Sequence, residues 1–171
     1  MSSEGQVPGP GRRRSRRATD AAAVIGVVHS AATVYWASGG TWLLWTLGSR
    51  VVETFSDRLW LLWPGVLVKL ALAIVPAVLV RLCWPAPRAP QMLMWAASVV
   101  LIVWGGLNTV VGNLVLAGVI RPGGRYDRNA MIGHAWLWDP LFLVWGVALA
   151  CALCSARPRG HAQRSVTRST S

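Results

Sequence analysis

The segment of residues 91–120, QMLMWAASVVLIVWGGLNTVVGNLVLAGVI, contains no ionisable side chain. A helix of about 20 apolar residues is long enough to cross the hydrocarbon core of a bilayer. An amphipathic helix on the surface of a soluble domain would instead carry charged residues along one face. The segment therefore predicts a membrane-spanning helix and places the chain among membrane proteins.

Three further apolar segments flank this one, at residues 21–40, 59–84 and 129–156. The first ends at Gly39-Gly40, a natural stop for a helix. The second is followed by Pro85 and Pro87, which we expect in a tight turn because proline cannot continue a helix. The pattern predicts an all-α, polytopic membrane protein in which residues 19–156 form a four-transmembrane-helix bundle.

The charged residues lie almost entirely between and beyond these segments. They make up 13% of the chain against 54% hydrophobic residues, and the formal net charge is +11. In a soluble protein such a charge would suggest nucleic-acid binding. Basic residues that flank apolar spans instead fix topology and contact anionic lipid. We therefore expect the lipid bilayer as the surroundings and no nucleic acid as a partner.

The distribution of basic residues predicts the orientation. Eleven lie on the side of the two tails and five on the opposite side, and cytoplasmic connections carry the excess of Lys and Arg. Residues 1–18 and 157–171 are accordingly predicted to be disordered, basic cytoplasmic tails. Nearly all basic residues are arginine, which suggests a GC-rich bacterial genome, so we expect the bacterial plasma (inner) membrane with both termini cytoplasmic.

The connection at residues 41–57 is predicted to contain a short amphipathic helix on the outer leaflet. Leu47, Val51 and Phe55 recur at helical spacing after Leu43, while Arg50 lies elsewhere on the helical wheel. Tryptophans gather near the same interface, at Trp42, Trp45, Trp60, Trp63, Trp136 and Trp138. They predict an aromatic belt, because indole rings favour the membrane interface; a ligand cage is the alternative.

Two short motifs carry a resemblance to a known family. His29 is followed by YWASGGTW at residues 35–42, and WDPL opens the last span at residues 138–141. In this order and spacing they resemble the small bacterial membrane proteins of the domain-of-unknown-function 3995 family, over about residues 21–153. The resemblance implies a four-helix membrane protein without an assigned activity, and it supplies no catalytic or binding residues.

Lys69, the only lysine of the chain, falls inside the second predicted span. An ionisable group at membrane depth costs about 2.5 to 3.5 kcal/mol, so it needs a partner or a function. Asp139 lies at a similar estimated depth and is one candidate partner. The competing hypothesis is that Asp139 caps a helix that begins at Pro140, which would make residues 129–138 a separate interfacial or re-entrant segment.

Other polar residues lie at comparable depth. His29 shares a helical face with Trp36, and Asn108 lies on the face of Gly105 and Gly112. Each could simply hydrogen-bond to a neighbouring helix. Together with Lys69 and Asp139, however, His29 and Asn108 predict a small polar cavity in the outer half of the bundle, beneath the tryptophan-rich loop.

Two redox hypotheses compete with this polar centre. Cys151 and Cys154 form a C-x-x-C pair, but at the end of the last span predicted to face the reducing cytoplasm. His29 and His134 could hold a haem between helices. We favour a non-enzymatic protein without cofactor or metal, either a subunit of a membrane partner or homo-oligomer, or a small binding or transport module. A membrane-embedded redox or haem-binding protein or enzyme is the alternative.

Overall fold

The computed structural model describes residues 10–82, 88–124 and 126–156. Within these ranges the chain is helical and contains no strand, as predicted. The elements in order are α1 (Pro10–Ala37), η1 (Leu44–Thr46), α2 (Ser49–Phe55), η2 (Leu59–Leu62), α3 (Trp63–Leu82), α4 (Arg88–Leu116), α5 (Arg128–Gly133), η3 (His134–Trp138) and α6 (Asp139–Ala156).

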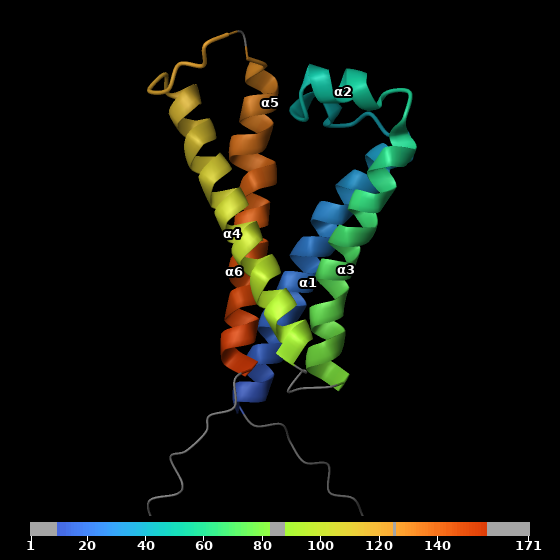
Figure 1. The fold of residues 1–171 in the computed structure, drawn as a ribbon, viewed down its shortest axis with the longest axis vertical. Coiled ribbons are helices and arrows are strands. Elements are labelled where there is room, and N and C mark those ends of the chain that lie inside the picture. The colour runs from blue at the N-terminus through green and yellow to red at the C-terminus, as the bar shows by residue number, and fades with distance from the viewer. Residues whose placement is uncertain (1–9, 83–87, 125, 157–171) are drawn as a thin grey trace, which may run out of the picture.

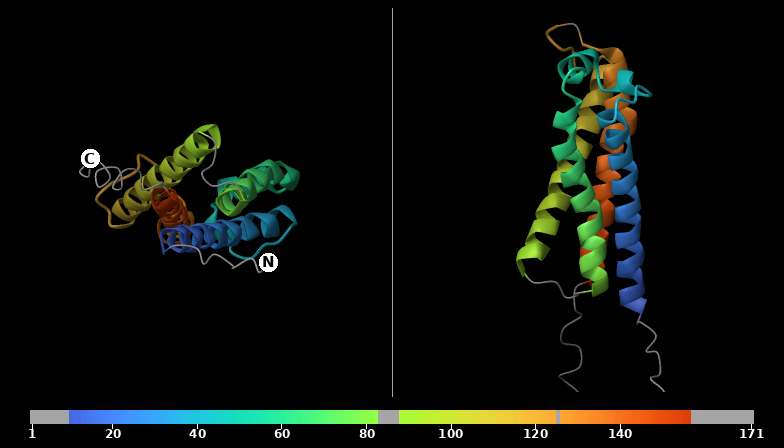
Figure 2. Two further views of the ribbon diagram at one scale, coloured as in Figure 1. Left: turned by 90° about the horizontal axis from the view of Figure 1, so that it is seen from below. Right: turned by 90° about the vertical axis from the view of Figure 1, so that its right-hand side faces the viewer.

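Four long helices run side by side, with α6 at the centre (Figures 1 and 2). Helix α6 packs against both α1 and α4, and α1 also packs against α3, whereas α3 and α4 hardly touch. The start of α1 and the end of α6 lie at the same end of the molecule, and α2 lies across the opposite end (Figure 1).

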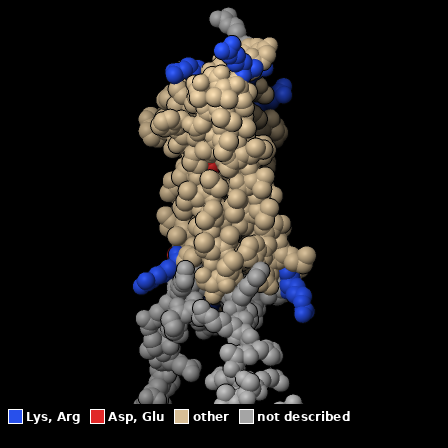
Figure 3. All heavy atoms as spheres, turned by 90° about the vertical axis from the view of Figure 1, so that its left-hand side faces the viewer, with Lys and Arg blue, Asp and Glu red and all other residues tan. Residues whose placement is uncertain are grey.

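In the described part of the chain, three helical stretches are long and apolar enough to cross a membrane, not the four predicted. They are Leu59–Leu79, Arg88–Leu116 and Arg128–Ser155. Helix α1 is not among them; it carries three buried polar residues, His29, Ser30 and Thr33. On the face drawn in Figure 3, Lys and Arg lie towards the two ends of the molecule, with an almost uncharged band between them.

Helices α4 and α6 approach most closely where one of them carries glycine. A Cβ on Gly105 would lie 2.5 Å from both the carbonyl oxygen of Asp139 and the amide nitrogen of Leu143. One on Gly146 would lie 2.9 Å from the backbone nitrogen of Ile102. Small residues allow such close backbone approach between membrane helices. The pairing of α4 with α6 therefore depends on these glycines.

Helix α1 is longer than the sequence predicts. It begins at Pro10, so residues 10–18, expected in a disordered tail, are helical. Proline is favoured in the first turn of a helix, and the Arg and Ala residues that follow are good helix formers. The rest of the two predicted tails, residues 1–9 and 157–171, lies outside the described residues, as does the turn expected at Pro85 and Pro87.

The connection at residues 41–57, which we call the outer connection, forms two short helices, η1 and α2, in place of one amphipathic helix. Leu43 has φ 58° and Gly48 has φ 96°, and these left-handed conformations break the helical repeat before and after η1. Leu43 therefore drops out of the predicted apolar face. The other predicted members of that face do share one surface. Leu47, just before α2, and Val51, within α2, both line the same cavity.

The last span, whose continuity through Pro140 the sequence left open, is continuous from Arg128 to Ala156. Asp139 does not cap a separate helix: the π-helical turn η3 precedes it, and its amide donates to the carbonyl oxygen of His134, five residues earlier. Pro140 explains the turn, because proline has no N–H and its ring collides with the carbonyl four residues before it. A π-helical turn relieves that conflict without ending the helix.

Five of the six tryptophans predicted to form the aromatic belt are exposed. Trp42 and Trp136 are each 72% exposed, and Trp45, Trp60 and Trp63 are also exposed. Trp138, expected in the belt, is buried, and so is Trp36. Both turn inward because their indole N–H groups find oxygen acceptors in the outer connection, which the next section describes.

Candidate binding centre

His29 of α1 lies in an aromatic cage formed by η3 and α6. Its ring centroid is 4.1 Å from that of Phe142, 5.8 Å from Trp138 and 6.4 Å from Trp145. The three rings recur at positions i, i+4 and i+7, and so share one helical face. His29 is only 4% exposed. Neither of its ring nitrogens has a hydrogen-bond partner among the described residues, which is costly for a buried polar group.

Lys69 of α3 reaches the same centre. Its Nζ donates to the Oγ1 of Thr33 over 3.0 Å and lies 5.6 Å from the ring centroid of Phe142. The Oγ1 of Thr33 in turn lies 3.5 Å from the carbonyl oxygen of His29, to which it donates. Helices α1, α3 and α6 therefore meet at one basic and aromatic cluster, which we call the Lys69 centre: His29, Thr33, Lys69 and Phe142.

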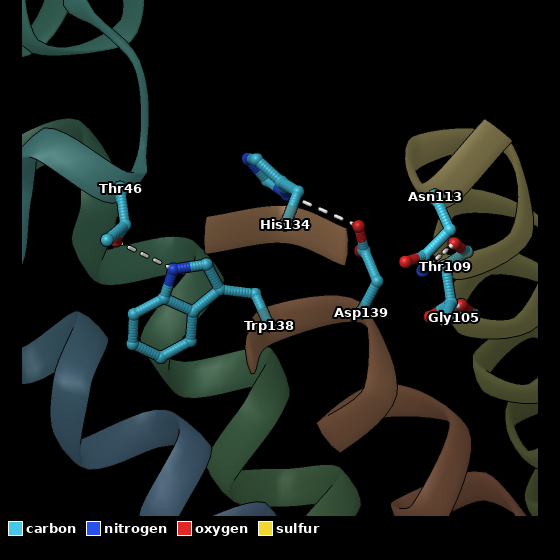
Figure 4. Close-up of polar contacts among 7 residues, drawn as sticks. All are labelled: Thr46, Gly105, Thr109, Asn113, His134, Trp138 and Asp139. Carbon is cyan, nitrogen blue, oxygen red and sulfur yellow. Dashed lines mark hydrogen bonds and ion pairs between the residues drawn. The ribbon is translucent and has the colours of Figure 1, made fainter. Parts of the chain in front are cut away.

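The suggested ion pair between Lys69 and Asp139 does not form. No described carboxylate lies within ion-pair distance of Lys69. Asp139, itself buried, has its Oδ2 3.4 Å from the Nδ1 of His134 (Figure 4). Matching depth did not bring the two side chains together because each points toward a different neighbour: Lys69 toward Thr33 of α1 and Asp139 toward His134 of η3.

Asn108 lies in α4, half-buried, on the stripe that contains Gly105 and Gly112. Among the described residues, no hydrogen bond joins it to the Lys69 centre. The neighbouring polar groups of α4 bond within their own helix: Thr109 Oγ1 donates to the carbonyl of Gly105 over 2.6 Å, and Asn113 Nδ2 to that of Thr109 over 2.7 Å (Figure 4). The polar groups of α4 thus form a second cluster beside Asp139.

The outer connection is attached to the last span directly above the Lys69 centre. The indole N–H of Trp138 donates to the Oγ1 of Thr46 over 2.9 Å (Figure 4). Gly133 touches Thr46 so closely that an added Cβ would collide with it. Trp36, whose ring lies 5.0 Å from that of Trp138, donates to the carbonyl of Trp42. These contacts close the outer end of the bundle.

Asp127 ties two helix starts together at the same end. Its Oδ1 accepts from the amides of Asn129 and Ala130 at the start of α5, and its Oδ2 accepts from the amide of Ser49 at the start of α2. The hydrogen bonds from Ala130 and Ser49 hold the pKa of this carboxyl below its usual value. The ionised carboxylate of Asp127 therefore joins the starts of α2 and α5, and we call this set of hydrogen bonds the clamp.

Sequence reasoning placed His29 and Lys69 correctly at one level but missed Phe142 and Trp145. The signal was present, because Trp138, Phe142 and Trp145 recur at helical spacing on one face.

The two histidines proposed for haem are engaged differently, since His29 packs among the rings of α6 and His134 faces Asp139. Cys151 and Cys154 are both exposed and free.

Comparison with known proteins gives one match. The model of the family described as "Protein of unknown function (DUF3995)" matches residues 26–149. That range contains every residue of the Lys69 centre, as well as Asn108, His134 and Asp139. No curated protein and no solved structure matches the chain.

Proposed function

This chain belongs to the DUF3995 family of proteins of unknown function, and from that premise we propose a function based on its own geometry. It is a non-enzymatic integral membrane protein of the bacterial plasma membrane, a binding or transport module that takes a small anion or anionic group at the Lys69 centre. All four long helices cross the bilayer, and both termini are cytoplasmic.

The crossing of α1 is supported by its length and by its partners. Its 28 residues extend about 42 Å at 1.5 Å per residue, enough for a bilayer core about 30 Å thick. The polar groups that lower its hydropathy are turned inward: Ser30 Oγ donates to the carbonyl of Gly26 over 2.7 Å, and Thr33 lies between His29 and Lys69. A helix with this polar face fits a place inside a bundle and not one facing lipid.

The single observation that carries the proposal is the unbalanced positive charge of Lys69. Its ammonium has three N–H donors, and among the described residues it has a hydroxyl and an aromatic ring as neighbours but no carboxylate within ion-pair distance. A cation held at membrane depth without a counter-charge is costly. An anionic ligand would remove that cost, and the N–H of the His29 ring, whose nitrogens have no partner among the described residues, lies in the same cluster as a further donor.

The experiment replaces Lys69 by Met and, as a matched control, by Arg. Each protein is examined by native mass spectrometry in detergent for a retained anionic ligand, and in proteoliposomes for chloride and proton flux. Wild-type protein and Lys69→Arg should show retention or flux, and Lys69→Met should lose it while keeping its melting temperature.

Two results would reject the proposal. The first is wild-type protein that retains no anion and carries no flux, which would show that the centre has no ligand of this kind. The second is failure of Lys69→Met to fold while Lys69→Arg folds without binding or flux, which would make the lysine structural. An anionic group contributed by a partner subunit would appear in the same mass spectra as a retained second chain.

A further inference from the structure

A second site lies outside the Lys69 centre, at the outer end of the bundle. A cavity of about 240 Å³ lies between α2, the end of α1 and η2. The side chains that form it are almost all apolar and include Trp36, Leu47, Val52, Phe55, Leu59 and Leu62. Apolar cavities of about 150 Å³ stay dry and accept small hydrocarbons. This one is therefore large enough for part of an alkyl chain.

The roof of the cavity is held in place by hydrogen bonds. The indole N–H of Trp36 donates to the carbonyl oxygen of Trp42 over 2.9 Å, and the amide of Trp42 donates to the hydroxyl of Tyr35 over 3.3 Å. At the other end of the roof, the amide of Ser49 donates to Asp127. A fixed roof means that the cavity exists before a ligand arrives, which lowers the cost of binding.

A polar hollow borders the same segment. It shares Leu47 and Val51 with the apolar cavity and is also lined by Ser49, Arg50 and Tyr126. Arg50 is exposed and forms no ion pair with any described carboxylate. The carboxylate of Asp127, which also lines the hollow, already accepts three backbone amides. The free positive charge beside an apolar cavity fits an amphiphile with an anionic head.

The surroundings identify the kind of amphiphile. Trp42 and Trp60 stand exposed beside the cavity, as residues at a membrane interface do. A cavity of this volume cannot take a helix, which is about 10 to 12 Å across with its side chains, so it does not fit a second copy of the chain. We propose that it binds one acyl chain of an anionic outer-leaflet phospholipid, whose phosphate pairs with Arg50.

The test uses phosphatidylglycerol and phosphatidylcholine with identical acyl chains, mixed in equal amounts with the detergent-purified protein. Native mass spectrometry should show wild-type protein retaining one phosphatidylglycerol at least tenfold over phosphatidylcholine. Val52→Trp and Leu62→Trp fill the cavity from opposite walls and should each abolish this retention. Arg50→Gln should keep a bound lipid but lose the headgroup preference. Val103→Trp, on the exposed face of α4, is the matched control and should behave as wild type.

A second measurement needs no variant. Phosphatidylglycerol with a photoreactive group on its acyl chain is irradiated with the wild-type protein, and the adduct should map to residues 36–62. The proposal is wrong if the adduct maps only to the exposed face of α4, or if wild-type protein retains both lipids equally and both cavity-filling variants retain them too. Lys69→Met should leave lipid retention unchanged, so this proposal and that of an anion at Lys69 can fail separately.

Discussion

Helix α4 faces two of the other long helices, α6 and α3, in opposite ways. Against α6 its backbone comes into contact at Gly105 and Gly146, whereas against α3 it leaves an apolar groove of about 330 Å³ lined by Pro76 and Ala97 among others. All three surfaces are apolar, and lipid is as apolar as they are. Hydrophobicity therefore does not determine which helix pair packs closely. The positions of the glycines determine it. The molecule has a tightly packed side at α4–α6 and an open side at α3–α4.

Gly105→Ala should have the largest effect on this difference. Its Cβ would lie 2.5 Å from backbone atoms of α6, which cannot rotate away, so we expect a loss of about 1 to 3 kcal/mol in unfolding free energy. Gly106→Ala is the matched control, because its Cβ would be 3.7 Å from the end of a flexible Leu143 side chain. Unfolding in detergent measures both, and equal stability would show that α4 and α6 are not in backbone contact.

Trp138→Phe should have the next largest effect, because it removes the indole that joins η3, at the outer end of the tightly packed side, to Thr46 of η1. The lost hydrogen bond to Thr46 and the smaller ring should lower unfolding free energy by about 1 kcal/mol or somewhat more. Trp136→Phe, two residues away and exposed, should change stability little. If the exposed tryptophan proved as important as the buried one, the attachment at Thr46 would be wrong.

On the open side, Ala97→Leu should be nearly neutral. The longer side chain extends into the groove between α3 and α4, so we expect a change within about 0.5 kcal/mol. Ala73→Leu is the matched substitution at the contact between α3 and α1, where Ala73 is 2% exposed and lies against Gly26. It should cost about 1 to 3 kcal/mol by overpacking. Equal costs for the two substitutions would show that α3 packs as tightly on α4 as it does on α1.

The smallest expected effect is the pH dependence of the clamp at Asp127. Because the pKa of its carboxyl is lower in the folded protein, the stabilisation is complete above the unfolded value of about 3.9 and is lost as pH falls through the folded value. The amides of Ala130 and Ser49 should therefore stay protected from hydrogen exchange at neutral pH and lose protection in acid. Asp127→Asn should show weaker protection with no such pH dependence; identical exchange in both proteins would rule out the clamp.

The membrane-like helices could be predicted from composition, because a stretch of about 20 apolar residues without charge is rare outside membrane-spanning helices. The partner of Lys69 could not. Depth counted along a helix fixes the level of a side chain but not its direction, and η3 contains a π-helical turn that changes which residues face α1 and α3 after residue 133. Asp139 consequently turns away from Lys69, while Phe142 and Trp145 face His29.

The outer connection shows a similar limit. Helical spacing correctly grouped Leu47, Val51 and Phe55 around one cavity. It did not reveal that Leu43 adopts a left-handed conformation, which depends on the hydrogen bonds made by the surrounding loop. The burial of Trp138 also could not be inferred, because an indole at an interface satisfies its N–H equally well with water or with a side chain such as Thr46.

The proposed four-span arrangement requires that α1 cross the membrane together with the three more apolar stretches. Single cysteines in a background without the native ones, at Arg17, Thr54, Arg88 and Gly123, can be treated with a membrane-impermeant maleimide in intact cells. We predict labelling of Thr54→Cys and Gly123→Cys from outside, and of Arg17→Cys and Arg88→Cys only after permeabilisation. Labelling of Arg17→Cys in intact cells would leave α1 outside the bilayer and contradict the four-span arrangement on which the Lys69 centre depends.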